Sequence, residues 1–263
     1  MITARYTEEK MSIHSHFHDG YQLIYVAKGS ARVTVSGRQY QAKAGTLVLI
    51  SRLESHAIDE ASPDYSRYTV RIAPQIHAHT GFLGDRLFSL LVNRPEQFRH
   101  CVDMSDCPQV ESLLAAMARE SGQNTQMEAE MLLFLLCQLL VLLCRAYPGQ
   151  VPEDLQRLSL VTRIQRHIET NIRERLTLES IAQQFHLSQS YLSHLFKAIT
   201  GSSIMGYCTA YRLQLAKGYL TQTDWEINRI LDACGFTDNS NFSRIFKQST
   251  GLTPSQFRKR YKE

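Results

Sequence analysis

This sequence has no closely spaced pairs of cysteines. Its six cysteines, at positions 101, 107, 137, 144, 208 and 234, form no Cys-x-x-Cys motif, which excludes the common zinc-ribbon and thioredoxin patterns. Such spacing predicts reduced, mostly buried thiols in a cytoplasmic protein. The first segment, MITARYTEEK, has no apolar core of signal-peptide length, so we expect no export.

Long hydrophobic runs are also missing. The most apolar segment, residues 131–144, is only fourteen residues long and is interrupted by Gln138, whereas a membrane span needs about 20 residues. It lies inside a predicted helix over 125–147, which follows a predicted amphipathic helix over 108–121. We therefore expect no membrane partner, and we expect other parts of the protein to cover the apolar helix.

The net positive charge lies entirely in one part of the chain. The whole sequence has 29 Lys and Arg against 25 Asp and Glu. Residues 151–263 contain fifteen against ten, a net charge of +5, whereas residues 1–150 have a net charge of −1. A basic C-terminal part favours contact with phosphates. The stretch 148–154, rich in proline, glycine and polar residues, is the predicted linker.

A short helical motif occurs twice in the basic part. Residues 190–201, SYLSHLFKAITG, match residues 240–251, SNFSRIFKQSTG, after a shift of fifty. In each copy apolar side chains recur at helical spacing, and the opposite face is polar and cationic. Each copy follows a shorter predicted helix, over 177–185 and 226–234, after a turn. This pattern predicts two helix-turn-helix units that bind DNA; the alternative is a duplicated helical domain with a solvated polar face.

Capping residues mark where these helices begin. Thr177, Ser188, Asp238 and Thr253 are the predicted N-caps, and Thr223 and Glu226 fit a capping box. Residues 204–220 predict one connecting helix of about 25 Å. A spacer of this size is suited to hold two recognition helices in successive major grooves, about 34 Å apart.

Residues 235–260 read GFTDNSNFSRIFKQSTGLTPSQFRKR. This stretch resembles the C-terminal signature of the AraC/XylS family of transcription regulators almost residue for residue. The resemblance implies a sequence-specific regulator of double-stranded DNA, with RNA polymerase as a partner if the protein is an activator.

The outward helix faces and the matching family positions together select the DNA contacts. The predicted base-contacting residues are Ser190, Ser193, His194, Asn239, Ser240, Ser243 and Arg244. Arg244 is the strongest choice because a guanidinium reaches guanine O6 and N7 together. The predicted phosphate contacts are Lys197, Arg212, Lys247, Arg258 and Lys259. For each of them the alternative is a solvated side chain.

The first part of the chain is of another kind. Short alternating or β-branched runs lie over 21–26, 31–35, 46–50 and 68–72, separated by turn residues, which predicts a small antiparallel barrel or jelly roll. The spacing His16-x-His18-x3-Gln22, followed later by His56, resembles the two cupin motifs. Cupins are the usual N-terminal module of sugar-sensing AraC relatives, so the resemblance implies a small-molecule effector, such as a sugar.

Metal-binding cupins have three histidines and a glutamate at the matching positions. This chain has His16, His18 and His56, but Gln22 replaces the glutamate. We predict no required cofactor; a divalent metal held by the three histidines is one interpretation. Contact with an organic effector and a structural role in the barrel are the others. The predicted effector-binding residues are His16, His18, Gln22, Tyr25, Arg32 and His56, although the sequence leaves the strand register open.

The sequence therefore predicts a multi-domain α+β protein. A cupin-like antiparallel β-barrel (jelly roll) that binds the effector occupies residues 1–100, a helical dimerisation or linker segment 101–150, and an all-α DNA-binding domain with two helix-turn-helix units 151–263. The family resemblance implies a homodimer formed through the apolar helix, with an intrachain core helix as the alternative. The predicted dimer contacts are Leu132, Leu135, Leu136, Leu139 and Leu143.

A second class of function is an enzyme. A cupin-type metalloenzyme, such as a dioxygenase or isomerase with an accessory DNA-binding tail, would also contain these histidines. It would need a general acid or base beside the metal, and the barrel segment offers no convincing carboxylate for that role. We therefore expect a regulator rather than an enzyme.

Overall fold

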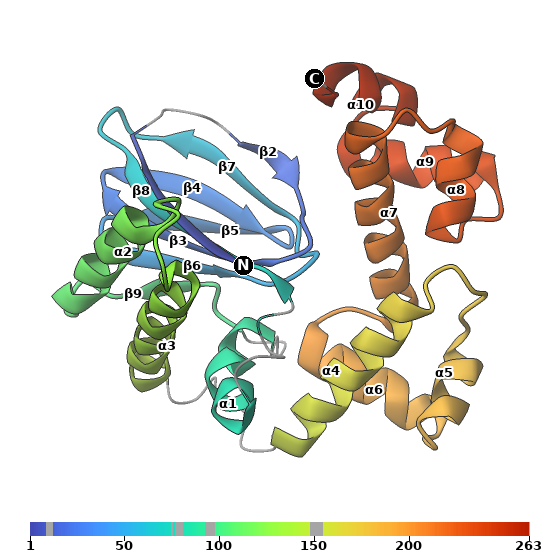
Figure 1. Ribbon diagram of the computed structural model, residues 1–263, viewed down its shortest axis with the longest axis horizontal. Coiled ribbons are helices and arrows are strands. Elements are labelled where there is room, and N and C mark those ends of the chain that lie inside the picture. Colours follow the sequence, from blue (N-terminus) through green and yellow to red (C-terminus); the bar gives the residue numbers. More distant parts are fainter. Residues whose placement is uncertain (9–12, 75, 77–80, 93–97, 148–154, 263) are drawn as a thin grey trace. The chain divides into compact units, whose positions relative to one another are not determined.

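The structure, a computed structural model, describes residues 1–263 except 9–12, 75, 77–80, 93–97, 148–154 and 263 (Figure 1). It consists of two compact units, Met1–Leu158 and Ser159–Glu263. The segment 101–150, predicted as a separate dimerisation or linker segment, belongs to the same unit as the β-strands. The predicted linker over 148–154 lies outside the described residues.

The first unit is built on two antiparallel sheets. Its strands are β1 (Ile2–Thr7), β2 (Ile13–His16), β3 (Tyr21–Lys28), β4 (Ser30–Val35), β5 (Arg38–Lys43), β6 (Thr46–Ile50), β7 (His56–Ala61), β8 (Ser66–Ile72) and β9 (Cys101–Asp103). One sheet has the order β1-β8-β3-β6-β9 and the other β2-β7-β4-β5. The antiparallel barrel expected from the sequence is confirmed.

Apolar side chains fill the space between the two sheets. Ile24 and Val26 of β3 meet Val33 and Val35 of β4 there, together with Ile58 of β7. In β4 buried residues alternate with half-buried ones, as expected for a strand with one face in a core. Because these side chains occupy the middle of the barrel, a polar ligand is more readily accommodated at its ends.

Three helices complete this unit: α1 (Gly81–Val92), α2 (Pro108–Glu120) and α3 (Glu128–Ala146). Helix α2 packs on β1 and β8, and α3 packs on α2, α1 and β1 (Figure 1). By length and composition α3 is a candidate membrane span. One of its faces is nevertheless buried inside a folded unit, which is the arrangement of an amphipathic packing helix.

Most of the predicted dimer contacts are wrong. The residues buried inside the unit are Leu132, Leu136, Leu139 and Leu143, because α2 and the sheet need a hydrophobic cover. For these four leucines the intrachain alternative is correct. Only Leu135 lies toward the other side of α3, the side on which Met131 and Phe134 are exposed.

The second unit is helical. Its elements are α4 (Leu155–Thr170, which crosses the boundary between the units), α5 (Leu178–Gln184), α6 (Gln189–Thr200), α7 (Ile204–Gln222), α8 (Ile227–Cys234), α9 (Asn239–Thr250) and α10 (Pro254–Tyr261). Helices α5 and α6 form the first helix-turn-helix, and α8 and α9 form the second. Helix α7 connects them (Figure 1).

Four predicted N-caps are confirmed, since Thr177, Ser188, Asp238 and Thr253 each accept a backbone N–H with the side chain. The capping box at Thr223 is wrong. Helix α7 continues to Gln222, so the Thr223 hydroxyl donates to the Tyr219 carbonyl at its end (2.7 Å), and Glu226 makes no side-chain cap. The cysteines are free, but only Cys208 and Cys234 are buried.

Candidate functional site

Each second helix of a helix-turn-helix buries one face and presents the other. Leu192, Leu195 and Phe196 fix α6 in the core, and Phe242 and Phe246 fix α9. The predicted base-contacting residues lie on the remaining faces. Ser190, His194, Asn239, Ser240 and Arg244 are exposed, and Ser193 and Ser243 are half-buried.

Polar side chains on α9 form hydrogen bonds with one another. The Arg244 guanidinium donates to Asn241 Oδ1 (3.0 Å), and the Ser243 hydroxyl donates to Asn239 Oδ1 (3.2 Å). Both acceptors are uncharged and both bonds are exposed, so neither side chain is held by a counter-charge and base edges are able to replace these partners. The surface of α9 is therefore available to a DNA groove.

Two of the predicted phosphate contacts form hydrogen bonds inside the helical unit. The Arg212 guanidinium, half-buried, donates to the carbonyls of Ile172 and Glu174, both at 3.0 Å. Arg258 is also half-buried and donates to the carbonyl of Trp225. Both cations join helices of the unit, which the sequence spacing does not reveal. Lys197, Lys247 and Lys259 are exposed, and for them phosphate contact stays a prediction.

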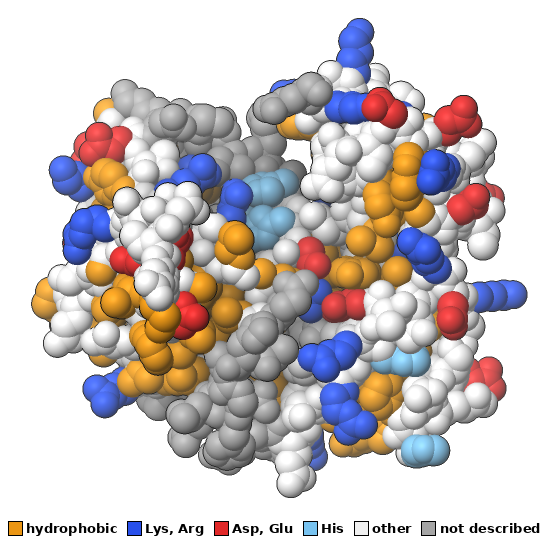
Figure 2. Space-filling model, in the orientation of Figure 1, with side chains coloured by type: hydrophobic (Ala, Val, Ile, Leu, Met, Phe, Trp, Pro, Cys, Tyr) orange, Lys and Arg blue, Asp and Glu red, His pale blue; other side chains and the backbone are white. Residues whose placement is uncertain are grey.

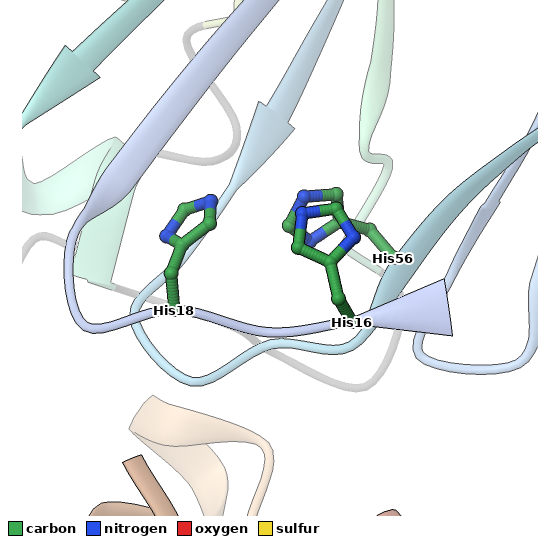
Figure 3. A group of neighbouring side chains, drawn as sticks. All are labelled: His16, His18 and His56. Atoms are coloured by element: carbon green, nitrogen blue, oxygen red, sulfur yellow. The ribbon is translucent and has the colours of Figure 1, made fainter. Parts of the chain in front are cut away.

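Three histidines gather at one end of the barrel (Figure 3). His16 ends β2, His56 begins β7 directly opposite it, and His18 follows in the next loop. One ring nitrogen of each lies within 4.8 Å of those of the other two. The sequence motif therefore brings its three imidazoles together, as predicted.

The buried imidazole of His56 has one ring nitrogen that accepts no hydrogen bond from the described residues. Its side chain is 2% exposed, and its Nδ1 lies 3.0 Å from the carbonyl oxygen of Glu54. Because a carbonyl only accepts, Nδ1 holds the proton and Nε2 presents a lone pair. Burial lowers the pKa of His56 to about 3, and among the described residues Nε2 has no hydrogen-bond partner.

His18 is oriented by the glutamine of the motif. Its Nε2 donates to the amide oxygen of Gln22 at 2.5 Å. Burial lowers the pKa of His18 as well. Gln22 itself is buried and shares the inward face of β3 with Ile24 and Val26.

Tyr25 and Arg32 do not line this site. Tyr25 follows the inward Ile24 and faces the other side of the sheet, where its ring lies 6.4 Å from that of Tyr68. Arg32 alternates with buried residues of β4 and forms an exterior ion pair with Glu60 (2.9 Å). Their assignment to the effector is wrong, because the strand register turns both side chains away from the interior.

A buried polar chain behind His56 was not predicted. The Glu54 carboxylate accepts from His100 Nε2 (2.9 Å) and from the Ser51 backbone N–H (2.8 Å), while the Tyr40 hydroxyl lies 2.9 Å from His100 Nδ1. These bonds hold the loop that leads into β7 and so position His56. His100 is distant from Glu54 in the sequence, and no local signal connects the two.

A barrel with a buried polar cluster at one end, joined to a basic domain with two helix-turn-helix units, defines a DNA-binding regulator controlled by a small molecule. A family model described as "AraC-like ligand binding domain" matches residues 1–137, and one described as "Helix-turn-helix domain" matches residues 181–260. The chain belongs to the AraC family of transcriptional regulators.

Known proteins agree with this assignment. The chain is 24% identical over 259 residues to the HTH-type transcriptional activator RhaR of Escherichia coli O139:H28, covering 98% of this chain and 90% of RhaR. It is 34% identical over 119 residues to the regulator YijO of E. coli K12, 45% of this chain and 42% of YijO. ToxT from Vibrio cholerae shares the fold, with a TM-score of 0.65 at 12% identity over 100% of this chain and 99% of that one.

Proposed function

We propose that a small organic molecule, bound at the histidine end of the barrel, controls transcription by this protein in the cytoplasm, with RNA polymerase as a partner. The buried Nε2 of His56, which faces two further histidines, is the observation that supports this location. RhaR is named as a transcriptional activator, which supports the polymerase. Wild-type ToxT of Vibrio cholerae has been crystallised with an unsaturated fatty acid bound, which supports an organic effector.

Control of DNA binding by the effector requires that the effector binds two states of the protein with different affinity. An effector changes DNA binding only if it binds the two states of the protein unequally, and typical coupling is about 1–3 kcal/mol, or roughly 5- to 150-fold. We therefore expect an active compound to change the Kd for a DNA site enriched from a random library by that factor. Gln22→Ala should remove the response, and Arg32→Ala, which removes an exterior side chain, should keep it. If both variants respond alike, the site is elsewhere.

We also propose that the three histidines bind a divalent first-row metal. Burial lowers the pKa of both His18 and His56, which favours neutral imidazoles, and the acceptor nitrogen of His56 is buried without a partner among the described residues; this donor set suits zinc and its neighbours. When bound, such an ion would supply Lewis acidity toward an oxygen of the effector. The Glu54 carbonyl, bonded to Nδ1 of His56, would hold that ligand in its orientation.

Elemental analysis of protein purified without chelators and without a histidine tag tests this. We expect about one metal ion per chain in the wild type, as for a three-histidine site. The metal should be lost in the double variant His16→Ala/His18→Ala and retained in His194→Ala, which removes an exposed histidine of α6. Wild-type protein without metal would contradict the proposal and leave a purely organic site.

The contacts of the carboxylates near the three histidines support a regulator rather than an enzyme. The Glu54 carboxylate is bonded to His100 and to the Ser51 backbone, and Asp19 pairs with Arg52 at 2.7 Å. Both carboxylates are therefore engaged in holding loops, whereas metal-assisted catalysis needs an acid or base that can transfer a proton.

We further propose a homodimer formed through the outer face of α3 rather than its buried leucines. Met131, Phe134, Leu135, Gln138 and Leu142 follow one another at helical spacing, and Phe134 is 70% exposed. A stripe of this spacing, apolar except at Gln138, suits pairing with a second copy of the same helix.

A charge on this stripe should separate the copies. We expect Phe134→Glu to raise the dimer dissociation constant by about 30-fold or more, the effect of losing an interface anchor of about 2 kcal/mol. Folding of the variant is checked by circular dichroism, and the mass by sedimentation equilibrium. Gln109→Glu, which adds an exposed charge on α2, is the control. A wild type that stays monomeric at micromolar concentration would contradict the dimer.

A further inference from the structure

Two arginines of β8 lie on the inner face of the five-stranded sheet. Arg71 pairs with Gln22 of β3, and Arg67 pairs with Val26. Directly paired residues of antiparallel strands project to the same side of a sheet. Arg67 and Arg71 therefore share the face of Gln22 and Val26, which is the face directed into the barrel.

A third arginine joins them from β1. Arg5 pairs with Thr69, which lies midway between Arg67 and Arg71 on β8. Diagonal neighbours across an antiparallel pair are within reach of long side chains. The three arginines therefore lie along one strip of this face, with Arg67 buried and Arg5 and Arg71 exposed.

No acidic side chain compensates these charges among the described residues. Arg67 is only 5% exposed, and its Nη1 is buried without a hydrogen-bond partner; its nearest aromatic neighbour is the Tyr65 ring, 5.6 Å away. Burial, followed by the charges of Arg5 and Arg67, lowers the pKa of Arg71. A buried cation without a counter-charge costs several kcal/mol, so this strip favours an anion.

Other arginines of the same unit show the contrast. Arg52 pairs with Asp19 at 2.7 Å, and Arg32 pairs with Glu60 at 2.9 Å. In both of these pairs the domain itself supplies a carboxylate to the arginine. The inner-face arginines lack such a partner within the described chain, which is the expected state of residues that receive their anion from a ligand.

The arginine strip adjoins the histidine site. Arg71 is paired with Gln22, the residue that holds His18. Burial, and then the charges of His16 and Arg71, lower the pKa of His18, so the guanidinium lies close to that ring. In Figure 2 a Lys or Arg side chain lies beside the histidine side chains at the surface of the molecule.

We infer that Arg5, Arg67 and Arg71 form an anion-binding subsite, and that the effector carries a carboxylate or phosphate group for this subsite while its uncharged polar part reaches the histidines. The inference rests on the proposed function, since it adds the chemical class of the effector to the proposed site. Guanidinium groups bind both kinds of anion through paired N–H donors. An uncharged sugar would leave Arg67 without a counter-charge.

Thermal unfolding with simple anions tests the subsite. The probes are inorganic phosphate and benzoate, each compared with chloride at the same ionic strength. We expect one of them to raise the Tm of the wild type by about 3 °C or more. Arg67→Met should remove the rise, and Arg32→Met, which removes an arginine from the exterior, should keep it. The probe that acts identifies the anion as phosphate or carboxylate.

The Tm measured without phosphate or benzoate is an independent test of the subsite. We expect Arg67→Met to raise the Tm in chloride buffer, because it replaces an uncompensated buried charge by an apolar side chain of similar length. A lower Tm in chloride, or an equal response of the wild type and both variants to the probes, would overturn the subsite. If Arg67→Met fails to fold, Arg71→Gln, at an exposed position, takes its place in the probe experiment.

The two proposals fail in different ways. An uncharged compound that changes DNA binding through Gln22 would disprove the anion subsite and leave the proposed function intact. Binding of phosphate or benzoate that depends on Arg67, with no compound able to change DNA affinity, would support the subsite and contradict the proposed control of DNA binding.

Discussion

Replacing Arg244 by alanine is expected to weaken binding to the preferred DNA site by about 1–3 kcal/mol, roughly 5- to 150-fold, and to relax the base preference at one position. Arg244 is exposed on α9 and is held only by the neutral side chain of Asn241. Its bidentate contact to guanine would be lost, whereas contacts to phosphates would stay.

Lys247 provides the matched comparison, since it lies on the same helix and is also exposed. We expect Lys247→Ala to weaken all DNA sequences similarly and to reduce the slope of log Kd against log salt by about one. Kd values are measured by fluorescence anisotropy on a site enriched from a random library and on its single-base variants. Unchanged sequence preference in Arg244→Ala would show that another face of α9 meets the bases.

Gly235→Ala is expected to have the largest effect on stability. Gly235 ends α8 with a φ of +74°, and a Cβ there would lie 2.4 Å from the carbonyl oxygen of Ile172 and 3.0 Å from the Cα of Arg173. Both are backbone atoms, so neither moves easily. Left-handed strain of about 1–2 kcal/mol and a steric cost of about 1–3 kcal/mol should together lower the free energy of unfolding of this unit.

Gly251→Ala separates the conformational cost of the left-handed backbone from the steric cost of the added Cβ. Gly251 ends α9 with a φ of +76°, but a Cβ there would have no atom within 4 Å, so only the conformational cost of about 1–2 kcal/mol is expected. The only tryptophan of the chain, Trp225, lies in the DNA-binding unit and reports its unfolding in urea by fluorescence. Equal losses in the two variants would show that the contact with Ile172 does not limit stability.

Local features of the sequence were sufficient to predict the helix starts and the buried helix faces of the DNA-binding unit. The caps at Thr177, Ser188, Asp238 and Thr253 depend on residues three positions apart, and the buried stripes of α6 and α9 follow from helical periodicity. The convergence of His16, His18 and His56 was predicted from the resemblance to the cupin motifs and not from local features, since His16 and His56 lie on β2 and β7, far apart in the sequence.

Features that depend on distant pairing were not predicted. Four runs were identified as strands, but β1, β2, β7 and β9, whose partners lie far away in the sequence, were missed. β5 was also missed, although it pairs with the adjacent β4, because its sequence RQYQAK is mostly polar and exposed. A shift of one residue in register moves every side chain of a strand to the other face. This is why Tyr25 and Arg32 were assigned to the interior, whereas Arg67 and Arg71, which lie there, were overlooked.

The hydrogen bonds around residues 172–174 have a consequence for the target DNA. Arg212 of α7 binds the carbonyls of Ile172 and Glu174, and Arg173 donates to the carbonyl of Ala233 near the end of α8 (3.2 Å). The segment that leads into the first helix-turn-helix is thereby fastened to the second. Adding one base pair between the two contacted segments rotates them by about 35° relative to each other. A fastened pair of units cannot follow that rotation, so we expect a target sequence that tolerates base changes better than insertions.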